Sequence, residues 1–318
     1  MSGDGTNAAS SWQDEFVPAD DGPHDPGGDF YYNETFWFSF FVPERGLGAW
    51  LYSGIRPSAG VTTGGLWLWD RHGSDPWEIP FYEQFCWLKP PVGASAQRIE
   101  LANGNSVTTV EPGMVYDLGY EDRQRMTAAL RFSGLERPVP LRPGMPPYPK
   151  ATHYDQTGRV TGHVVLDGER IDVDCYAMRD RSWGTRKERG YRPVGYTWLA
   201  GASQSLLVFS RPTPEGEDEI YTGYVRRGDE VSYVASGRRS VQRDPECGWV
   251  TGMDLSAVDE RGTRISAQAS AVSRMLLPHS TSVCSATLLD WNLAGTRVYG
   301  EDQDVWPLHE WRMLTRRR

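Results

Sequence analysis

Residues 153–184 read HYDQTGRVTGHVVLDGERIDVDCYAMRDRSWG, and their pattern predicts a β-hairpin. The Asp167-Gly168 dipeptide supplies the two positive-φ positions of a type I′ turn, and apolar and polar residues alternate on both sides of it. Because cross-strand partners count outward in step from the turn, the dipeptide also fixes the register. One predicted face carries the pairs Val164–Ile171, Gly162–Val173 and Val160–Cys175, and the other carries His163–Asp172, Thr161–Asp174 and Arg159–Tyr176.

The second strand of this hairpin leads into a dense group of polar and aromatic residues. If the strand stays regular as far as Asp180, that carboxylate lies on the same face as Asp174 and Tyr176, because side chains alternate across a strand. Arg179 and Arg181 then point the opposite way.

The composition excludes several classes of protein. The chain has 318 residues, 12% of them aromatic, with 34 Gly and 22 Pro, which is typical of many short strands joined by tight turns. A net charge of -9 argues against a nucleic-acid partner, because phosphate binding needs a basic surface. The cysteines are too far apart for a zinc motif or a disulfide framework. The absence of a secretory signal or a bilayer-spanning apolar run predicts a cytoplasmic protein.

The rest of the sequence predicts an all-β chain in two halves. Residues 1–28 carry few apolar side chains and are expected to be a mobile leader. A first β domain is expected over residues 29–136, followed by a proline-rich linker at 137–149 that marks the domain boundary. A second β domain over residues 150–318 then contains the hairpin. Only the short segment Leu308 to Leu314 near the C-terminus looks helical.

The candidate chemistry depends on individual residues, because the motifs of familiar enzyme classes are missing and no histidine spacing indicates a metal site. An acid in an apolar cavity is held partly neutral and can donate a proton, and an aromatic ring can face a developing cation. Asp180 and Trp183 are candidates for these catalytic roles, with His153 and Tyr154 as further candidates. Physical argument alone favours a plainer interpretation, in which Asp180 caps a turn and Trp183 fills a barrel end.

Several other residues are candidates for contact with a substrate. Tyr196 and Trp198 line either a pocket or a core, and Tyr176 either meets the substrate and moves water or a proton, or simply stacks on Arg159. Arg181 binds either a substrate carboxylate or a nearby acid. The acidic run Glu301-Asp302-Gln303-Asp304 has no His partner in sequence and is expected to be solvated.

The hairpin and its Arg179-to-Gly184 continuation resemble the AttH-like and carotenoid 1,2-hydratase (hydroxyneurosporene synthase-like) superfamily, in which a similar hairpin ends in Asp-His-x-Trp-Gly. The strand with Asn33-Glu34 and the strand with Gly300-Glu301 look like its uncharacterised bacterial branches. The resemblance implies two lipocalin-like antiparallel β-barrel domains packed together, a cavity for an apolar ligand, and acid chemistry without a cofactor. It places Asp180 and Trp183 at the motif's acid and tryptophan positions. Arg181 stands where the family has His, and a guanidinium cannot relay protons as imidazole does.

Three functional hypotheses follow. The leading one is a cofactor-independent lyase or isomerase, of hydratase or dehydratase type, that acts on a hydrophobic terpenoid, steroid or polyketide. The second is a non-catalytic lipocalin-like carrier of apolar small molecules, which the same architecture supports. The third is an assembly protein whose aromatic strands bury a partner surface, and it predicts a stable oligomer. None of the three involves a metal, a nucleic acid or a membrane span.

Overall fold

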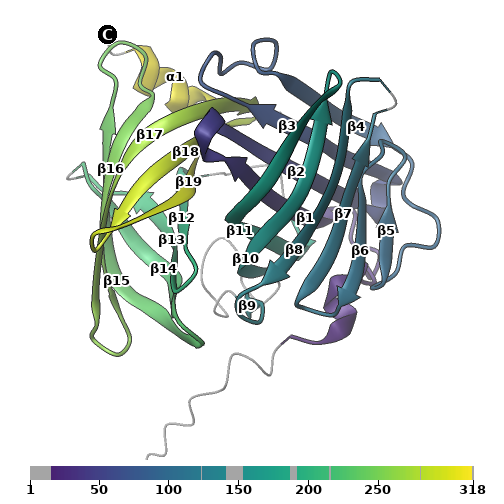
Figure 1. The fold of residues 1–318 in the computed structure, drawn as a ribbon, viewed down its shortest axis with the longest axis horizontal. Coiled ribbons are helices and arrows are strands. Elements are labelled where there is room, and N and C mark those ends of the chain that lie inside the picture. Colours follow the sequence, from purple (N-terminus) through teal and green to yellow (C-terminus); the bar gives the residue numbers. More distant parts are fainter. Residues whose placement is uncertain are drawn as a thin grey trace, which may run out of the picture.

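The computed structural model describes residues 16–122, 124–140, 153–186, 192–214, 216–279 and 281–316, and it is built almost entirely of antiparallel strands. Figure 1 shows a curled sheet beside a closed barrel. The all-β prediction with two packed β units is therefore confirmed. The two units differ in one respect: the second is a closed eight-stranded barrel, whereas the first is a half-barrel that curls without closing.

The first sheet has the strand order β4-β3-β2-β1-β11-β10-β8-β7-β6-β5, with β9 paired to β10. Its strands are β1 (Tyr32–Val42), β2 (Leu47–Arg56), β3 (Val61–Trp69), β4 (Phe81–Leu88), β5 (Arg98–Glu100), β6 (Ser106–Glu111), β7 (Val115–Glu121), β8 (Met126–Gly134), β9 (Val139–Pro140), β10 (His153–Leu166) and β11 (Glu169–Thr185).

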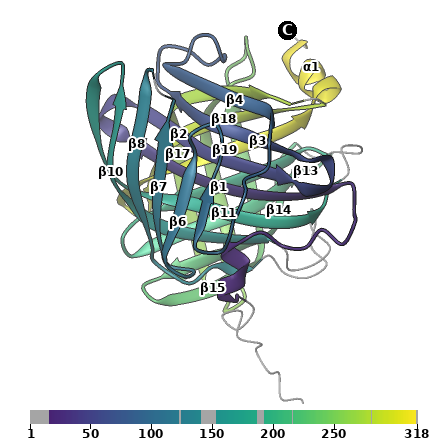
Figure 2. The same ribbon diagram turned by 90° about the vertical axis from the view of Figure 1, so that its right-hand side faces the viewer.

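The barrel follows in simple chain order, each strand pairing with the next and the last with the first, and it lies behind the sheet in Figure 2. Its strands are β12 (Val194–Ala200), β13 (Gln204–Pro212), β14 (Asp218–Arg227), β15 (Glu230–Arg243), β16 (Val250–Asp259), β17 (Arg264–Pro278), β18 (Ser282–Leu293) and β19 (Thr296–Pro307). The C-terminal helix α1 (Leu308–Arg316) confirms the predicted helical segment.

The hairpin of β10 and β11 has the predicted register at every pair, from Val164–Ile171 outward to Arg159–Tyr176. Asp167 and Gly168 take φ values of 49° and 85°, the left-handed conformation that a type I′ turn requires. The pairing continues without a bulge to Ser182, so Asp180 lies on the face predicted for it.

The hairpin lies in the middle of the first sheet, where β11 pairs with β1 and β10 pairs with β8. The last strand of the sheet ends at Thr185 and the first strand of the barrel begins at Val194. The boundary between the two units therefore lies later in the chain than the predicted linker at 137–149. A proline-rich segment marks a break in pairing, and such a break also occurs between two strands of one sheet. Most of the predicted linker lies outside the described residues.

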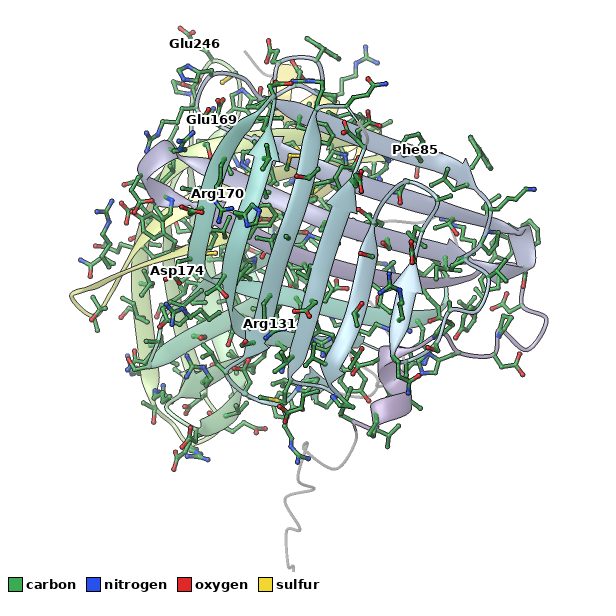
Figure 3. The ribbon with its side chains drawn as sticks, turned by 45° about the vertical axis from the view of Figure 1, so that its right-hand side comes forward. Phe85, Arg131, Glu169, Arg170, Asp174 and Glu246 are labelled. Carbon is green, nitrogen blue, oxygen red and sulfur yellow. The ribbon has the colours of Figure 1, made fainter. Side chains whose placement is uncertain are left out.

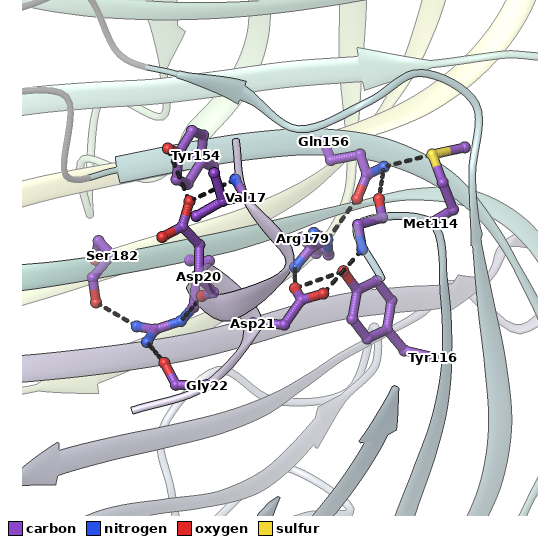
Figure 4. A network of polar contacts seen from close by, with 12 residues as sticks. Val17, Asp20, Asp21, Gly22, Met114, Tyr116, Tyr154, Gln156, Arg179 and Ser182 are labelled. Atoms are coloured by element: carbon purple, nitrogen blue, oxygen red, sulfur yellow. Dashed lines mark hydrogen bonds and ion pairs between the residues drawn. The ribbon is translucent and has the colours of Figure 1, made fainter. Parts of the chain in front are cut away.

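Part of the predicted mobile leader is folded into the molecule. The turn of 3-10 helix at Pro18–Asp21 buries the side chains of Asp20 and Asp21. Figure 4 shows Asp21 accepting a hydrogen bond of 2.6 Å from the Tyr116 hydroxyl and lying 3.6 Å from Arg179 Nη1. The expectation of a leader through residue 28 is therefore wrong from Pro18 on, because these carboxylates find buried donors that a polar composition does not reveal.

The described residues form two large apolar cores and a small third cluster around Phe36 and Ile55. The barrel interior has its own cluster around Val208, Leu255 and Trp291. A larger cluster fills the half-barrel and continues across the contact between the two units, where the outer face of barrel strands such as β12 and β18 meets β1 and β2 of the sheet. We call this contact the inter-sheet layer, defined by Phe41, Trp37 and Trp50 on one side and Tyr196, Trp198 and Glu301 on the other.

No helix in the described ranges combines the length and apolar character needed to cross a membrane.

Candidate functional site

The polar face of the hairpin changes its surroundings along its length. Near the turn it is exposed, and Figure 3 shows Arg170 and Asp174 on the outer surface. Farther along β11 the same face lies against the barrel, so that Asp180 belongs to the inter-sheet layer. The register places Asp155 directly opposite Asp180, and His153 is on the same face because it is two residues away on β10.

These three residues form a compact acid–imidazole group. His153 Nε2 and Asp155 Oδ2 are hydrogen-bonded at 2.9 Å, and the Tyr196 hydroxyl donates to Asp155 Oδ1 over 2.8 Å from the barrel side. One ligand-type atom of each of His153, Asp155 and Asp180 lies within 4.8 Å of the others. The side chain of Asp180 keeps some exposure, yet its Oδ1 is covered and has no hydrogen-bond partner within the described ranges. Asp155 is therefore satisfied, whereas Asp180 retains a free oxygen.

The electrostatics of the group favour a neutral Asp180. Burial raises the pKa of the Asp180 carboxyl, the nearby Asp155 raises it further, and the charges of His153 and Arg186 only partly oppose this. Burial lowers the pKa of His153, but Asp155 and Asp180 more than compensate, so its pKa is raised overall. The site thus combines an acid and an imidazole whose pKa values are both raised.

A second acid lies in the same inter-sheet layer. Glu301 is 3% exposed, and its two carboxyl oxygens lie 3.0 and 2.8 Å from the indole nitrogen of Trp50, which donates to them. Burial raises the pKa of Glu301 to about 8. Trp50 contacts Trp37 edge to face at 5.8 Å, and Trp37 contacts Tyr196 at 6.0 Å. Aromatic rings therefore connect the two acids.

An open cleft of about 540 Å³ lies at one rim of the layer. Both units line it, with Phe41 and Tyr176 from the sheet and Tyr299 and Ala200 from the barrel. Its size is in the usual range for a small-molecule site. Tyr176 precedes Asp180 by four residues on the same face of β11, so the cleft lies roughly 13 Å from Asp180 along the strand.

The predicted site residues fall into three places. His153, Asp180 and Tyr196 are brought together, and Trp198 lies farther along the same layer, where it packs against Phe41. Tyr176 lines the cleft instead.

The remaining predicted residues, Tyr154, Arg181 and Trp183, lie on the opposite face of the sheet, because odd and even positions of a strand point to opposite sides. Arg181 forms a buried ion pair with Glu34 and donates to the carbonyl oxygens of Asp20 and Gly22, so of the two predicted partners it binds the nearby acid. Trp183 stacks on His24 at 4.0 Å. The structure therefore separates Trp183 from Asp180, although the two are close in sequence.

The structure also brings together a possible metal-ligand set that sequence spacing did not predict, namely His153, Asp155 and Asp180. His153 Nε2 and Asp155 Oδ2 are hydrogen-bonded to each other, so an ion could bind through these two atoms only if that hydrogen bond broke.

Sequence reasoning missed Asp155 and Glu301. The predicted register contained the signal for Asp155, because extending it by five pairs from Val160–Cys175 sets Asp155 against Asp180. The expectation that residues 301–304 are solvated is wrong. Asp302 and Asp304 point into the barrel, where Arg239 lies 2.6 and 2.8 Å from their oxygens. A partner 63 residues away in the chain cannot be read from local sequence.

The fold, a curled sheet packed on a closed barrel, defines a class of two-unit β proteins. Three solved structures share the fold: an AttH protein from Nitrosomonas europaea (TM-score 0.60, 14% identity, covering 91% of this chain and 95% of that one), CghA (0.58, 11%, 89% and 92%), and kievitone hydratase from Nectria haematococca (0.54, 9%, 86% and 88%). CghA has also been solved with Sch210972. The AttH-like part of the predicted resemblance is confirmed at the level of the fold.

Residues 17–302 match the family model of a domain of unknown function, DUF7064, and the chain belongs to that family. No curated protein matches the sequence.

Proposed function

We propose that this protein is a cofactor-independent lyase or isomerase that uses Asp180 as a general acid on an apolar substrate in the inter-sheet layer. The observation that carries this proposal is a buried carboxyl oxygen of Asp180 that has no hydrogen-bond partner among the described residues, beside Asp155, whose two carboxyl oxygens are hydrogen-bonded to His153 and Tyr196. Buried polar groups are nearly always paired, so an unpaired acid indicates a place for another molecule.

The chemistry would begin with transfer of the Asp180 proton to a carbon–carbon double bond or to a hydroxyl group. Protonation of the double bond leaves a carbocation, which either adds water and loses a proton or loses a proton from a neighbouring carbon. Protonation of a hydroxyl group allows water to leave, and the resulting carbocation then loses a proton from a neighbouring carbon to form a double bond. Each course returns one proton to the site, so no cofactor is consumed, and positioned acids of this kind contribute roughly 10²- to 10⁴-fold to a rate.

His153 would move the proton to and from Asp180. Its ring lies within 4.8 Å of the acid, a separation that one water can bridge, and Asp155 with Tyr196 holds the ring in place. The role of cation stabilisation falls to Trp37 rather than to Trp183. Trp37 is the register partner of Asp180 on β1 and lies in the same layer, and an aromatic face attracts positive charge.

The aromatic lining supports a hydrophobic substrate, of the terpenoid, steroid or polyketide kind. The hydratase among the fold relatives supports a lyase reaction, and a carotenoid hydration is the particular form that the sequence resemblance suggests. We also propose that the protein belongs to an uncharacterised bacterial branch of the AttH-like and carotenoid 1,2-hydratase superfamily.

The test is Asp180→Asn, assayed on compounds that the protein retains from a mixed terpenoid, steroid and polyketide extract. Native mass spectrometry of released ligand would detect gain or loss of one water, or an unchanged mass with a changed retention time. We expect turnover to fall at least 100-fold with binding preserved. The matched control is Asp172→Asn, an exposed acid on the same face of β11, which should leave turnover unchanged. Equal turnover in Asp180→Asn would refute the role of Asp180.

The cleft at Tyr176 and Tyr299 favours a second candidate, a carrier of apolar molecules, because it offers a ligand-sized volume away from the acids. A carrier would release every retained compound unchanged in mass and retention time.

A further inference from the structure

Glu301 is the second acid of the inter-sheet layer, and the proposed proton transfer does not use it. Its only neighbours by hydrogen bond are the Trp50 indole and Gln303, and no Arg, Lys or His is paired with it among the described residues. This differs from the next two acids of β19, because Asp302 and Asp304 share Arg239 inside the barrel. An uncompensated acid with so little solvent access is costly to fold around, so its presence calls for an explanation.

The surroundings of Glu301 contain further polar atoms without partners. The indole N–H groups of Trp37, Trp69 and Trp198 are buried, and no acceptor for them exists in the described part of the chain. Trp198 is the cross-strand partner of Glu301, and Trp37 contacts the Trp50 ring that binds Glu301. Unpaired buried donors are rare in folded proteins. Trp69 also contacts the Trp50 ring, so all three unpaired donors belong to rings that neighbour Glu301 or its partner Trp50, and such donors suit a ligand that carries oxygen.

The position of Glu301 relative to the cleft fits an entering ligand. Tyr299 lines the cleft, and Glu301 follows two residues later on the same face of β19, roughly 7 Å farther into the layer. On the sheet side, Trp50 of β2 lies opposite Ser39 of β1. Two residues from Ser39 in one direction along β1 is Phe41, at the cleft, and two residues in the other direction is Trp37, which lies opposite Asp180. A ligand that passes from the cleft toward Asp180 therefore meets Glu301 first.

From this geometry we propose that Glu301 and the surrounding indole N–H groups bind an oxygen atom of the substrate, so that the substrate is an oxygenated ring compound, such as a cyclic ketone, rather than a hydrocarbon. The assignment deepens the proposed function, since it names the substrate class of that same layer. Burial keeps Glu301 protonated at neutral pH, because its pKa is raised to about 8, and a protonated carboxyl can donate to a ketone oxygen.

The experiment measures binding rather than turnover. The probes are two pairs of different size, androstane-3,17-dione with 5α-androstane and 2-decalone with decalin, and tryptophan fluorescence reports binding. We expect the wild-type protein to bind at least one ketone about tenfold or more tightly than its matched hydrocarbon at pH 6.5. Glu301→Leu should lose that preference, and Glu301→Gln, which keeps a polar contact with Trp50, should retain part of it. The wild-type preference should also weaken as the pH rises past 8.

Two results would overturn the assignment: equal affinity of the wild type for ketone and hydrocarbon, including no binding of either, or an unchanged preference in Glu301→Leu. Asp180→Asn serves as the second variant, and it should keep the ketone preference while losing turnover. If Asp180→Asn keeps its turnover while the ketone preference is intact, the proposed reaction is refuted and the substrate class stands. If the ketone preference is absent while Asp180→Asn loses turnover, the substrate class is refuted and the proposed reaction stands. Circular dichroism of each variant confirms that the fold is retained.

Discussion

Near the end of β11, the two faces of the strand differ in how their buried charged side chains are paired. On one face, Arg179 and Arg181 lie inside the half-barrel with Asp21 and Glu34, and each cation has an acid beside it. On the other face, one residue away in sequence, Asp180 has a covered oxygen that no described residue hydrogen-bonds. The second face meets the barrel and holds the acid to which we assign the proposed chemistry. The two faces differ in how their buried charged groups are paired, so burial of charge alone does not distinguish them.

The largest expected effect on stability comes from breaking an ion pair on the first face. Arg181→Met removes the guanidinium group that is paired with the fully buried Glu34, together with its hydrogen bonds to Asp20 and Gly22. We expect a loss of about 3–5 kcal/mol in the free energy of unfolding, as is usual when one partner of a buried pair is removed. Urea denaturation measures it.

The control for that variant is Arg159→Met on β10. Arg159 and Asp174 form a well-aligned ion pair at 2.7 Å, but both side chains are more than half exposed. Exposed pairs contribute about 0–1 kcal/mol, so this variant should change the unfolding free energy by no more than that. Equal losses in the two variants would contradict the distinction between the two ion pairs.

An intermediate effect is expected from Glu301 and depends on pH. The pKa of Glu301 is raised from 4.5 to about 8 by burial, so the folded protein binds more protons than the unfolded chain between these values. The stability that this proton contributes is present below pH 4.5 and is lost as the pH rises toward 8, by at most about 1.4 kcal/mol per unit. Relative to Glu301→Gln, the wild type should therefore lose stability across this range. Parallel pH curves for the two proteins would show that Glu301 titrates normally.

The smallest effect on stability is expected at Asp180, in contrast with its large effect on turnover. Asp180→Asn removes an acid whose buried Oδ1 has no hydrogen bond to lose, so the free energy of unfolding should change by less than about 1 kcal/mol or rise slightly. Thermal unfolding beside Arg181→Met makes the comparison direct. A loss as large as that of Arg181→Met would mean that Asp180 is structural.

Local sequence was sufficient for the hairpin and for one wall of the site. The Asp167-Gly168 turn fixes every pair from Leu166–Glu169 to His153–Ser182, and with it the face on which Asp180 lies. The same rule predicts that Trp183 and Asp180 diverge, although their closeness in sequence suggested a joint role.

The other wall of the site could not be predicted, because it comes from residues distant in the chain. Tyr196 reaches Asp155 from the barrel, and Trp50 meets Glu301 across 251 residues of sequence. The pairing of β1 with β11 likewise has no local signal. For this reason the predicted domain boundary fell before the hairpin, while the sheet closes around it.

The pairing of β1 with β11 also has a consequence for biosynthesis. Thr35 and Ser182, which share a hydrogen bond of 2.6 Å, are separated by 147 residues in the chain. While the ribosome synthesises the intervening strands, β1 can pair with β2 but not yet with β11. The aromatic residues of β1 therefore lie at an open sheet edge during this time. Unpaired apolar edges are prone to aggregate. The nascent chain therefore passes through a long interval in which it is a natural client for chaperones, and that interval ends only when β11 has emerged.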